Sequence, residues 1–296
     1  MEWDAEKYQK FSQMQIDIGN HAIANLNPQP GEHILDIGCG IGNLTEKIAI
    51  EIGDGKVIGI DNDATMIQTC IKRRKTLNSA NMEFIRQSAV DLDFTNQFDA
   101  VFSNIVLHWI RDVSKVFLKI YQALKPNGRL SIGTLYTEPT IKLEVTREED
   151  IPNKQQISLS DIEMRYMASF IEKGHYKDIL TLEEFMAYQT QVDKNVVYHT
   201  HTIEEFKEML EKARFTDIVF EKRILTNYYD NCGHYLDYRQ SSIWVYFLSF
   251  FPKEYRIAVA NKLKALIENE WNQMPERKKL LPITEPWPVL FIQARK

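Results

Sequence analysis

The stretch "ILDIGCGIGNLT", Ile34–Thr45, carries glycines at Gly38, Gly40 and Gly42 directly after a short apolar run. Glycine-rich turns between a strand and a helix let the backbone approach a nucleotide-like ligand closely. The stretch therefore predicts a strand, a ligand-binding turn and a helix. The identity of the ligand depends on the residues that surround the glycines.

Two phosphate-binding motifs fail to match this turn. A phosphate loop needs Gly-x-x-x-x-Gly-Lys followed by Ser or Thr, and no such pair follows these glycines. A dinucleotide motif needs Gly-x-Gly-x-x-Gly, but its third glycine position holds Asn43 when counted from Gly38, and Thr45 when counted from Gly40. The turn is therefore weak evidence for a pyrophosphate ligand.

Two acidic residues favour a different ligand. Asp36 precedes Gly38 by two residues, and Asp61 ends the next apolar run, "KVIGID". A carboxylate at Asp36 would face the ligand near the strand end, where it would repel a pyrophosphate but suit an ammonium group. A carboxylate at the position of Asp61 is typical of ribose recognition.

Strand and helix patterns alternate along the first half of the chain, which predicts an α/β fold with a parallel sheet covered on both faces. The expected strands are 33–38, 56–62, 82–88, 98–104, 128–136, 216–225 and 288–296. The expected helices between them are 43–52, 64–77, 113–124 and 202–215, and "KPNG" at 125–128 is expected to stop a helix and turn the chain.

The domain expectation is a single domain, 1–296, with two helical insertions. An amphipathic helix over residues 4–26 opens it and ends at "NPQPG". The core is expected at 1–136, 201–227 and 287–296, and the insertions at 137–200 and 228–286. Such insertions can cap a ligand site, since open α/β sheets bind ligands at the carboxyl ends of their strands.

Composition restricts the classes of function. The 296 residues are 44% hydrophobic, and 41 acids against 36 bases give a net charge of -5, which argues against broad nucleic-acid binding. Cys39, Cys70 and Cys232 lie far apart in sequence, so neither a disulfide framework nor a zinc site is expected. We expect no metal, no membrane span, no secretory signal in "MEWDAEKYQKF", and a cytoplasmic location.

The motifs together resemble those of class I S-adenosylmethionine-dependent methyltransferases. "ILDIGCGIGNLT" is similar to the family's first motif, Asp61 to its ribose acid, and "FDAVFSN" and "LKPNGRLSI" to later motifs in the same order. The resemblance covers about residues 34–136, the last helix–strand pair and the final strand. It implies a Rossmann-like, seven-stranded, mostly parallel sheet flanked by helices, with helical cap insertions, and S-adenosylmethionine as cofactor.

The resemblance also implies a set of cofactor-binding residues. The loop would hold the methionine part, Asp61 the ribose, and residues after the second and third strands the adenine; "RQSAVDL" departs from the family in having Ser88 where many members have Asp. Ordinary structural roles remain alternatives: a tight turn for the glycines, a cap for Asp36, and helix packing for Met66. The implied residues are Asp36, Gly38, Cys39, Gly40, Asp61, Asn62, Met66, Ser88, Ala89 and Asn104.

The acceptor side follows the fourth strand, in "SNIVLHWIRD". "LHW" resembles juvenile hormone acid methyltransferase, with close variants in trans-aconitate and malonyl-carrier-protein methyltransferases, all of which esterify carboxylates. A carboxylate needs no general base, but it needs donors, and His108, Trp109 and Gln15 are suitable donor types. With a hydroxyl or amine acceptor, His108 would be the base candidate. Each of the three has a structural alternative: a satisfied buried histidine, a packing indole and a backbone-binding amide.

The second insertion is rich in aromatic residues, which line an apolar acceptor pocket or form a local core. The expected function is O-methylation of a small-molecule or carrier-linked carboxylate by a monomer or homodimer. The alternatives are methylation of nitrogen, carbon or sulfur, and cofactor binding without catalysis. The aromatic residues are Tyr228, Tyr229, Tyr235, Tyr238, Trp244, Tyr246, Phe247, Phe250 and Phe251.

Overall fold

A computed structural model describes residues 13–77, 79–137, 156–189, 199–241 and 244–296. The chain divides into two compact units. The sheet unit comprises residues 2–139, 198–225 and 287–296, and the helical unit comprises residues 140–197 and 226–286. Each unit is described separately below.

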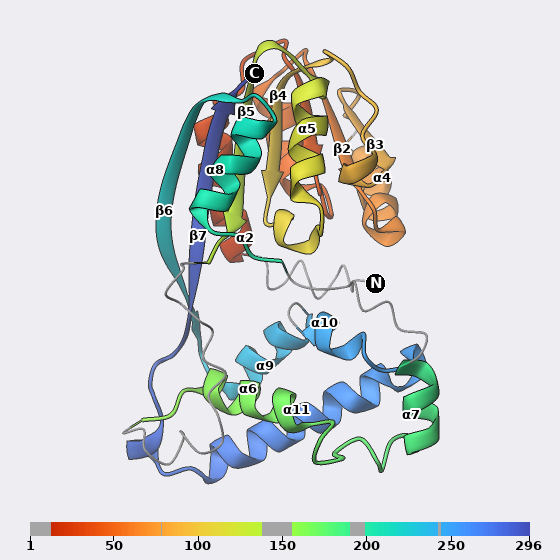
Figure 1. Ribbon diagram of the computed structural model, residues 1–296, viewed down its shortest axis with the longest axis vertical. Coiled ribbons are helices and arrows are strands. Elements are labelled where there is room, and N and C mark those ends of the chain that lie inside the picture. Colours follow the sequence, from red (N-terminus) through yellow and green to blue (C-terminus); the bar gives the residue numbers. More distant parts are fainter. Residues whose placement is uncertain (1–12, 78, 138–155, 190–198, 242–243) are drawn as a thin grey trace. The chain divides into compact units, whose positions relative to one another are not determined.

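The sheet has seven strands in the order β3-β2-β1-β4-β5-β7-β6 (Figure 1). The pairs β1–β2, β1–β4, β2–β3 and β4–β5 are parallel and β5–β7 is antiparallel, which confirms the predicted mostly parallel sheet. The strand order reverses direction beside β1, and such a reversal is where open α/β sheets bind ligands. The strands are β1 His33–Ile37, β2 Lys56–Asp61, β3 Met82–Arg86, β4 Phe98–Asn104, β5 Leu124–Leu135, β6 Thr216–Tyr229 and β7 Ile283–Arg295.

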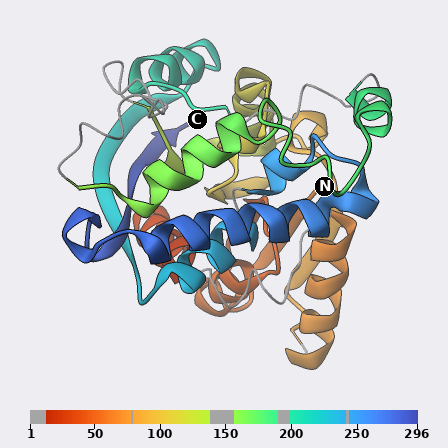
Figure 2. The same ribbon diagram turned by 90° about the horizontal axis from the view of Figure 1, so that it is seen from below.

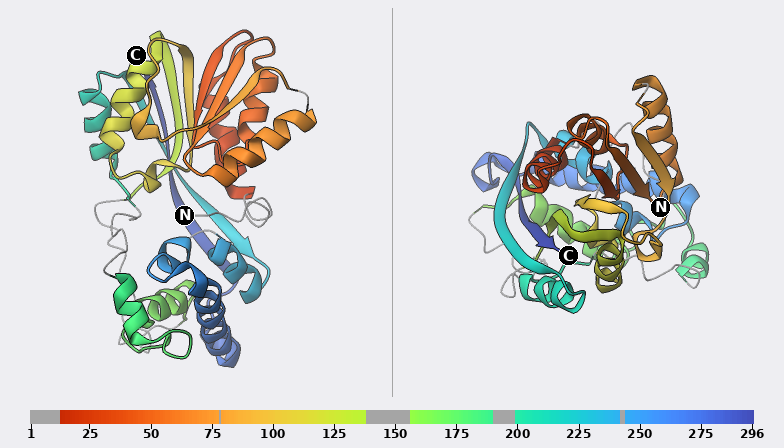
Figure 3. Two further views of the ribbon diagram at one scale, coloured as in Figure 1. Left: turned by 90° about the vertical axis from the view of Figure 1, so that its right-hand side faces the viewer. Right: turned by 90° about the horizontal axis from the view of Figure 1, so that it is seen from above.

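Helices cover both faces of this sheet, as Figures 1 and 3 show. Leu35 and Ile37 belong to the core that contains Phe117 and Phe206, from the helices on one face. Asp36, between them, points to the other face and bonds to Thr45. The alternation follows from the two-residue period of a strand. The helices of this unit are α2 Gln13–Leu26, α3 Asn43–Glu51, α4 Ala64–Leu77, α5 Val113–Ala123 and α8 Ile203–Lys212.

Some element boundaries differ from the prediction. The helix expected at 4–26 is observed from Gln13, and its residues 4–12 lie outside the described part of the chain. The helix stop expected at "KPNG" is confirmed, since α5 ends at Ala123. The strand expected at 128–136 starts earlier, because β5 begins at Leu124; residues 125–128 form an irregularity opposite Phe98 and Ala100, with Asn127 in the left-handed region (φ 65°). β6 and β7 also run further than predicted, to Tyr229 and from Ile283.

The helical unit contains helices that pack on one another, and Figure 2 shows α6 lying along α11. A capping box begins α6: the Ser158 hydroxyl accepts from the Asp161 N–H, and the Asp161 carboxylate accepts from the Ser158 N–H, both at 3.0 Å. None of the described helices is long and apolar enough to cross a membrane. The helices are α6 Leu159–Ser169, α7 Leu182–Gln189, α9 Cys232–Ser241, α10 Trp244–Leu248 and α11 Arg256–Gln273.

Six of the nine aromatic residues of the second insertion belong to this unit's core. Tyr229, Tyr235, Tyr238, Trp244, Phe247 and Phe251 are buried, and several rings contact one another edge-on or tilted. Tyr228 is exposed, and the side chain of Tyr246 lies outside what the structure describes. The local-core alternative therefore describes the six buried members of the group.

Candidate functional site

The glycine turn after β1 combines one packed glycine with one open glycine. Gly38 has φ 74°, and a Cβ there would lie 2.1 Å from Cγ2 of Val106, so no larger residue fits. Gly40 has φ 54°, and a Cβ there would meet nothing within 4 Å, so its backbone faces open space. The turn is anchored on β2, because the N–H groups of Gly38 and Cys39 both donate to the Ile60 carbonyl. This geometry suits close approach of a ligand to the backbone at Gly40.

Asp61 holds this turn from the end of β2. Its Oδ2 accepts from the Gly40 N–H at 3.0 Å, and its Oδ1 accepts from the Asp63 N–H at 2.9 Å. Burial raises the pKa of Asp61, and the two backbone donors oppose that rise. A carboxylate has further lone pairs for ribose hydroxyls. Asp61 is thus placed beside the open glycine, where the sequence predicted a ribose contact.

The Asp36 carboxylate is buried and is bonded within the protein. Its side chain is 2% exposed, and its Oδ2 accepts a hydrogen bond from the Thr45 hydroxyl at 2.6 Å. Burial raises the pKa of Asp36 to about 7, with the Thr45 hydrogen bond opposing and the charge of Asp61 reinforcing the rise. The expectation that this carboxylate is open toward the ligand needs correction, because strand alternation turns it toward α3. It can still act on a ligand through its charge.

The residues predicted for the adenine lie at the ends of β2 and β3. Asn62 is exposed and its carbonyl accepts from Arg86 Nε at 3.2 Å, whereas Met66 is buried in the first turn of α4. Ser88 is half-buried at the N-cap of the short 3-10 helix Ala89–Asp91, and Ala89 is buried. These residues occupy neighbouring strand ends, as the resemblance requires, with Met66 and Ala89 the more enclosed members.

Two of the cysteines meet at this turn although they are distant in sequence. The Cys70 thiol donates to the Gly40 carbonyl at 3.0 Å, and the thiols of Cys39 and Cys70 share a hydrogen bond that, together with burial, raises the pKa of Cys39. All three cysteines are free thiols. Among the described residues no group of three or more His, Cys, Asp or Glu is arranged to hold a metal ion. The hydrogen bond from Cys70 therefore helps to hold the backbone of Gly40 in place.

Asn104 joins the end of β4 to α2. Its Nδ2 donates to the backbone carbonyl of Gln15 at 2.8 Å, and Gln15 itself is buried. The Asn104 Oδ1 is buried and has no hydrogen-bond partner among the described residues. An unsatisfied buried acceptor is uncommon and suggests a ligand donor such as an ammonium group. This observation fits S-adenosylmethionine, whose methionine part carries an ammonium group.

His108 and Trp109 lie in a second 3-10 helix, Leu107–Trp109, just after β4. His108 is 3% exposed, and burial lowers its pKa to about 3, so its imidazole is neutral at physiological pH. The ring of Trp109 is half-buried, with its centroid 5.1 Å from that of His108. The structure therefore places two of the predicted donors together, and both are uncharged.

Two further histidines, which the sequence motifs did not single out, join this region. The His199 N–H donates to the His108 carbonyl at 2.8 Å, and the Thr137 N–H donates to the His201 carbonyl at 3.0 Å. The Nε2 atoms of His199 and His201 are buried without a hydrogen-bond partner among the described residues. Burial lowers the pKa of His201, Glu205 opposes this, and His199 adds to it. The sequence feature that could have indicated these residues is the pair of histidines in His199-Thr200-His201, just before α8.

Comparison with known proteins is consistent with this arrangement. Residues 28–214 match the family model described as a methyltransferase domain. Trans-aconitate 2-methyltransferase of Acidovorax ebreus is 27% identical over 131 residues, which cover 44% of this chain and 49% of that protein. Malonyl-[acyl-carrier protein] O-methyltransferase 1 of Ilyobacter polytropus is 23% identical over 59% of this chain and 61% of that protein. The chain thus spans about half to two thirds of the length of these curated relatives.

A solved structure supports the fold independently. Phosphoethanolamine N-methyltransferase 2 of Haemonchus contortus, in complex with phosphomonomethylethanolamine and S-adenosylhomocysteine, superposes with a TM-score of 0.51. The match has 21% sequence identity and covers 95% of this chain and 52% of that chain. Since the family model matches well over half of the chain and coincides with the glycine turn, Asp61 and the "LHW" helix, the chain belongs to the methyltransferase-domain family.

Proposed function

We propose that this protein transfers a methyl group from S-adenosylmethionine to the carboxylate of a small-molecule or carrier-linked acceptor. The observation that carries the proposal is the pair of neutral donors, His108 and Trp109, directly after β4 in the sheet unit whose turn at Gly40 is held by Asp61. Two relatives are named trans-aconitate 2-methyltransferase and malonyl-[acyl-carrier protein] O-methyltransferase 1, and both named acceptors carry a carboxylate, which supports the same acceptor class.

The proposed chemistry requires little from the protein beyond positioning. S-adenosylmethionine, when bound, supplies a methyl group already activated on a positively charged sulfur. Asp61, the Gly40 backbone and the Asn104 oxygen would hold this cofactor, and Asp36 would favour its positive charge from behind. The acceptor carboxylate is ionised at neutral pH, so no residue needs to remove a proton.

Neutral donors suit a carboxylate nucleophile better than cations would. The imidazole of His108 and the indole of Trp109 can each donate one hydrogen bond to one carboxylate oxygen while the other oxygen attacks. They add no positive charge that would weaken the nucleophile. Because charge is neutralised as the reaction proceeds, a dry site also favours the transition state. The segment that carries His199 and His201 adjoins this region, because the His199 N–H donates to the His108 carbonyl, and it adds two buried imidazole nitrogen atoms.

An amine acceptor is the second candidate, because the Haemonchus contortus neighbour is named as an N-methyltransferase. Such an acceptor would call for a base or for anionic residues around its ammonium form. With a pKa of about 3, His108 is a poor base at physiological pH. The carboxylate proposal accounts better for this residue. Cofactor binding without catalysis is a third candidate, which only a turnover measurement separates from the first two.

The proposal is tested by incubating the protein with methyl-labelled S-adenosylmethionine and a matched panel of carboxylic acids, their alcohols and their amines. We expect label in base-labile esters of the acids, and we expect acids with an apolar part or a carrier to react best. Transfer only to amines, thiols or alcohols would refute the carboxylate proposal. Calorimetric binding of S-adenosylhomocysteine without turnover on any acceptor would favour the non-catalytic alternative.

The donor roles give a sharper prediction. Replacing Trp109 by Phe or His108 by Asn should raise the acceptor KM by about ten-fold or more, the value of one good hydrogen bond to a charged group, and leave S-adenosylhomocysteine affinity unchanged. The matched control is His33→Asn, because His33 is exposed at the other end of β1. Unchanged KM in both donor variants would exclude them as acceptor ligands.

The proposal also covers the cellular compartment, the role of the helical unit and the oligomeric state. Three free thiols suit a reducing compartment, so a cytoplasmic location is proposed. The helical unit is proposed as a cap that follows strands β5 and β6 in sequence, and the active species as a monomer or homodimer.

A further inference from the structure

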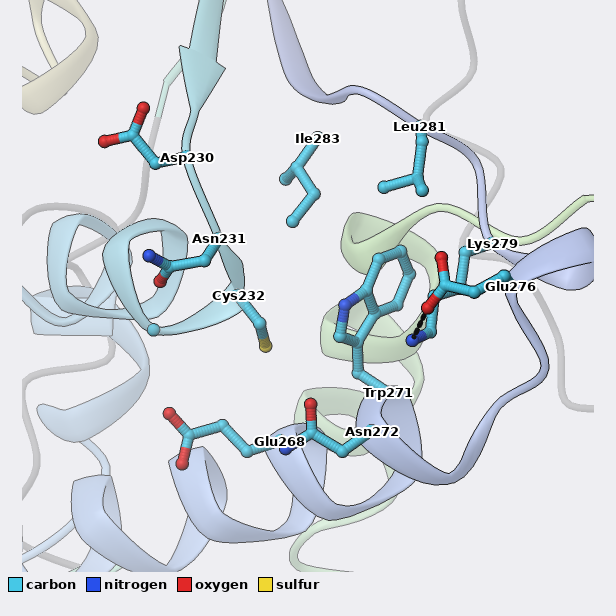
Figure 4. Close-up of a pocket in the computed structure, with 11 residues that line it drawn as sticks. Asp230, Asn231, Cys232, Glu268, Trp271, Asn272, Glu276, Lys279, Leu281 and Ile283 are labelled. Carbon is cyan, nitrogen blue, oxygen red and sulfur yellow. Dashed lines mark hydrogen bonds and ion pairs between the residues drawn. The ribbon is translucent and has the colours of Figure 1, made fainter.

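The helical unit contains a cavity of about 370 Å³, within the size range of small-ligand sites (Figure 4). Its wall comes from three segments of the chain: the start of α9, the last turns of α11, and the stretch that leads into β7. None of its residues belongs to the sheet unit or to the methyl-transfer site proposed above. The lining residues are Asp230, Asn231, Cys232, Gly233, Glu268, Trp271, Asn272, Glu276, Lys279, Leu281 and Ile283.

Negatively charged side chains outnumber positively charged ones in the wall of the cavity. Three carboxylates line it, from Asp230, Glu268 and Glu276, against one cation, Lys279. Lys279 is already engaged, because its Nζ lies 2.7 Å from Glu276 Oε1 and 5.4 Å from the centre of the Trp271 ring. An anionic ligand would therefore find no uncompensated cation in this wall.

Glu268 is the least exposed of the three carboxylates: its side chain is 35% exposed, against 73% for Glu276 and 88% for Asp230. Its nearest cation is Lys264, whose Nζ is 3.8 Å away and is held more closely by Asp237 at 2.6 Å. The Cys232 thiol lies in the field of Glu268: burial first, and then this charge, raise the pKa of Cys232 to about 12. With three carboxylates and one paired lysine, the lining of the cavity carries a net negative charge.

The Cys232 thiol is a second and independent feature of the site. It is 8% exposed, has no hydrogen-bond or disulfide partner among the described residues, and points into the space between Glu268 and Trp271 (Figure 4). Gly233 beside it has no side chain that could enter the cavity; a Cβ there would lie 3.2 Å from Asn231 Oδ1 and 3.8 Å from Glu268 Oε1. An unpartnered thiol that faces the cavity leaves a weak hydrogen-bond donor available to a bound molecule.

The nature of the ligand follows from these constraints. The carboxylates are not grouped to hold a metal ion, as no metal-binding cluster occurs among the described residues. Trp271, Leu281 and Ile283 provide an apolar wall. We propose that this cavity binds a small organic cation, with its ammonium group beside Glu268 and its apolar body against Trp271. A neutral or anionic molecule of the same shape lacks the positive charge that would pair with the Glu268 carboxylate.

The test is calorimetric titration of the full-length protein with phenethylammonium, 2-phenylethanol and phenylacetate, which differ only at the polar end. We expect phenethylammonium to bind at least ten-fold more tightly than either isostere. Glu268→Gln should weaken its binding by about ten-fold, whereas Glu254→Gln, at an exposed site outside the cavity, should not change it. Equal affinity for the three compounds, or full affinity in Glu268→Gln, would overturn the proposal.

A second measurement on the unmodified protein guards against a variant that fails to fold. The rate at which N-ethylmaleimide alkylates Cys232 is followed by peptide mass spectrometry, with Cys39 and Cys70 as internal references in the sheet unit. Saturating phenethylammonium should slow alkylation of Cys232 several-fold and leave the two references unchanged. An unchanged rate at Cys232 places the compound elsewhere and refutes the site. An unchanged circular dichroism spectrum and thermal unfolding curve verify that each variant is folded.

Discussion

Gly38 shows how one missing side chain shapes the ligand-binding turn. Its positive φ and the 2.1 Å approach of Val106 act together, whereas Gly53 has a positive φ of 58° with nothing within 4 Å. Gly38→Ala should therefore lower the free energy of unfolding by about 2–4 kcal/mol, from strain plus overpacking. Gly53→Ala should lower it by about 1 kcal/mol, from strain alone. Urea denaturation measures both, and equal losses would contradict the packing argument.

Asp36 should link cofactor binding to protons. With a pKa of about 7 it is about half protonated at pH 7, and a nearby positive ligand favours its ionised form, so binding should release about half a proton. Titration of S-adenosylmethionine in two buffers of different ionisation enthalpy measures this release. It should vanish near pH 9, where Asp36 is already ionised, and in Asp36→Asn. Equal proton release by the variant would rule out Asp36 as the source.

The raised pKa of Asp36 also makes the stability of the protein depend on pH. Below pH 3.8 Asp36 is protonated in both the folded and the unfolded chain, and between pH 3.8 and about pH 7 mainly the folded state keeps the proton. Between about pH 4 and pH 7 the folded state therefore binds more protons, and this group lowers the free energy of unfolding as pH rises. Stability curves of the unliganded protein and Asp36→Asn should diverge over this window.

Among the elements, α6, α9 and α10 of the helical unit are joined by one buried acid. Glu163 is fully buried and accepts hydrogen bonds from Tyr235, from Arg239 Nε at 2.7 Å and from the Trp244 indole, while Arg239 also pairs with Glu285. Glu163→Gln keeps the shape but removes the charge that balances a buried guanidinium. We expect a loss of about 3–5 kcal/mol, as for other broken buried ion pairs.

Thermal unfolding followed by circular dichroism measures this loss. The matched control is Asp178→Asn, which removes an exposed carboxylate that pairs with Lys262 on α11. The control should leave the melting temperature unchanged, because exposed ion pairs contribute little. A similar melting temperature for Glu163→Gln and the parent would show that the network does not hold the three helices together.

The division of the whole molecule into two units predicts which segments a bound cofactor protects from amide hydrogen exchange. Every residue proposed to hold the cofactor lies within 2–139 of the sheet unit, and none lies in the helical unit. Saturating S-adenosylhomocysteine should therefore slow amide hydrogen exchange most at the ends of β1, β2 and β4, and less in α9 and α11. Exchange mass spectrometry measures both regions at once. Equal protection of α9 and α11 would show that the two units respond as one.

Local patterns in the sequence were sufficient for the alternating fold and the glycine turn. The β-branched run before Gly38, the acid at Asp61 and the helix that begins at Asn43 depend on residues close together in the chain, and the structure has them as predicted. Boundaries failed where pairing between distant strands sets them: β6 and β7 extend past their patterns, and β5 begins at Leu124, which pairs with Phe98 of β4. Pairing partners that are distant in sequence leave little local signal.

The sequence alone was enough to indicate the methyltransferase family and the turn at Gly40, since motif spacing is a local property. Only the tertiary structure turned Asp36 away from the open face, joined Cys70 to the Gly40 carbonyl, and brought His199 to the His108 carbonyl. It also divided the aromatic residues of the second insertion into buried core and the exposed Tyr228. These outcomes depend on which segments pack together, and burial, which sets the pKa of Asp36 and of His108, exists only once the chain has folded.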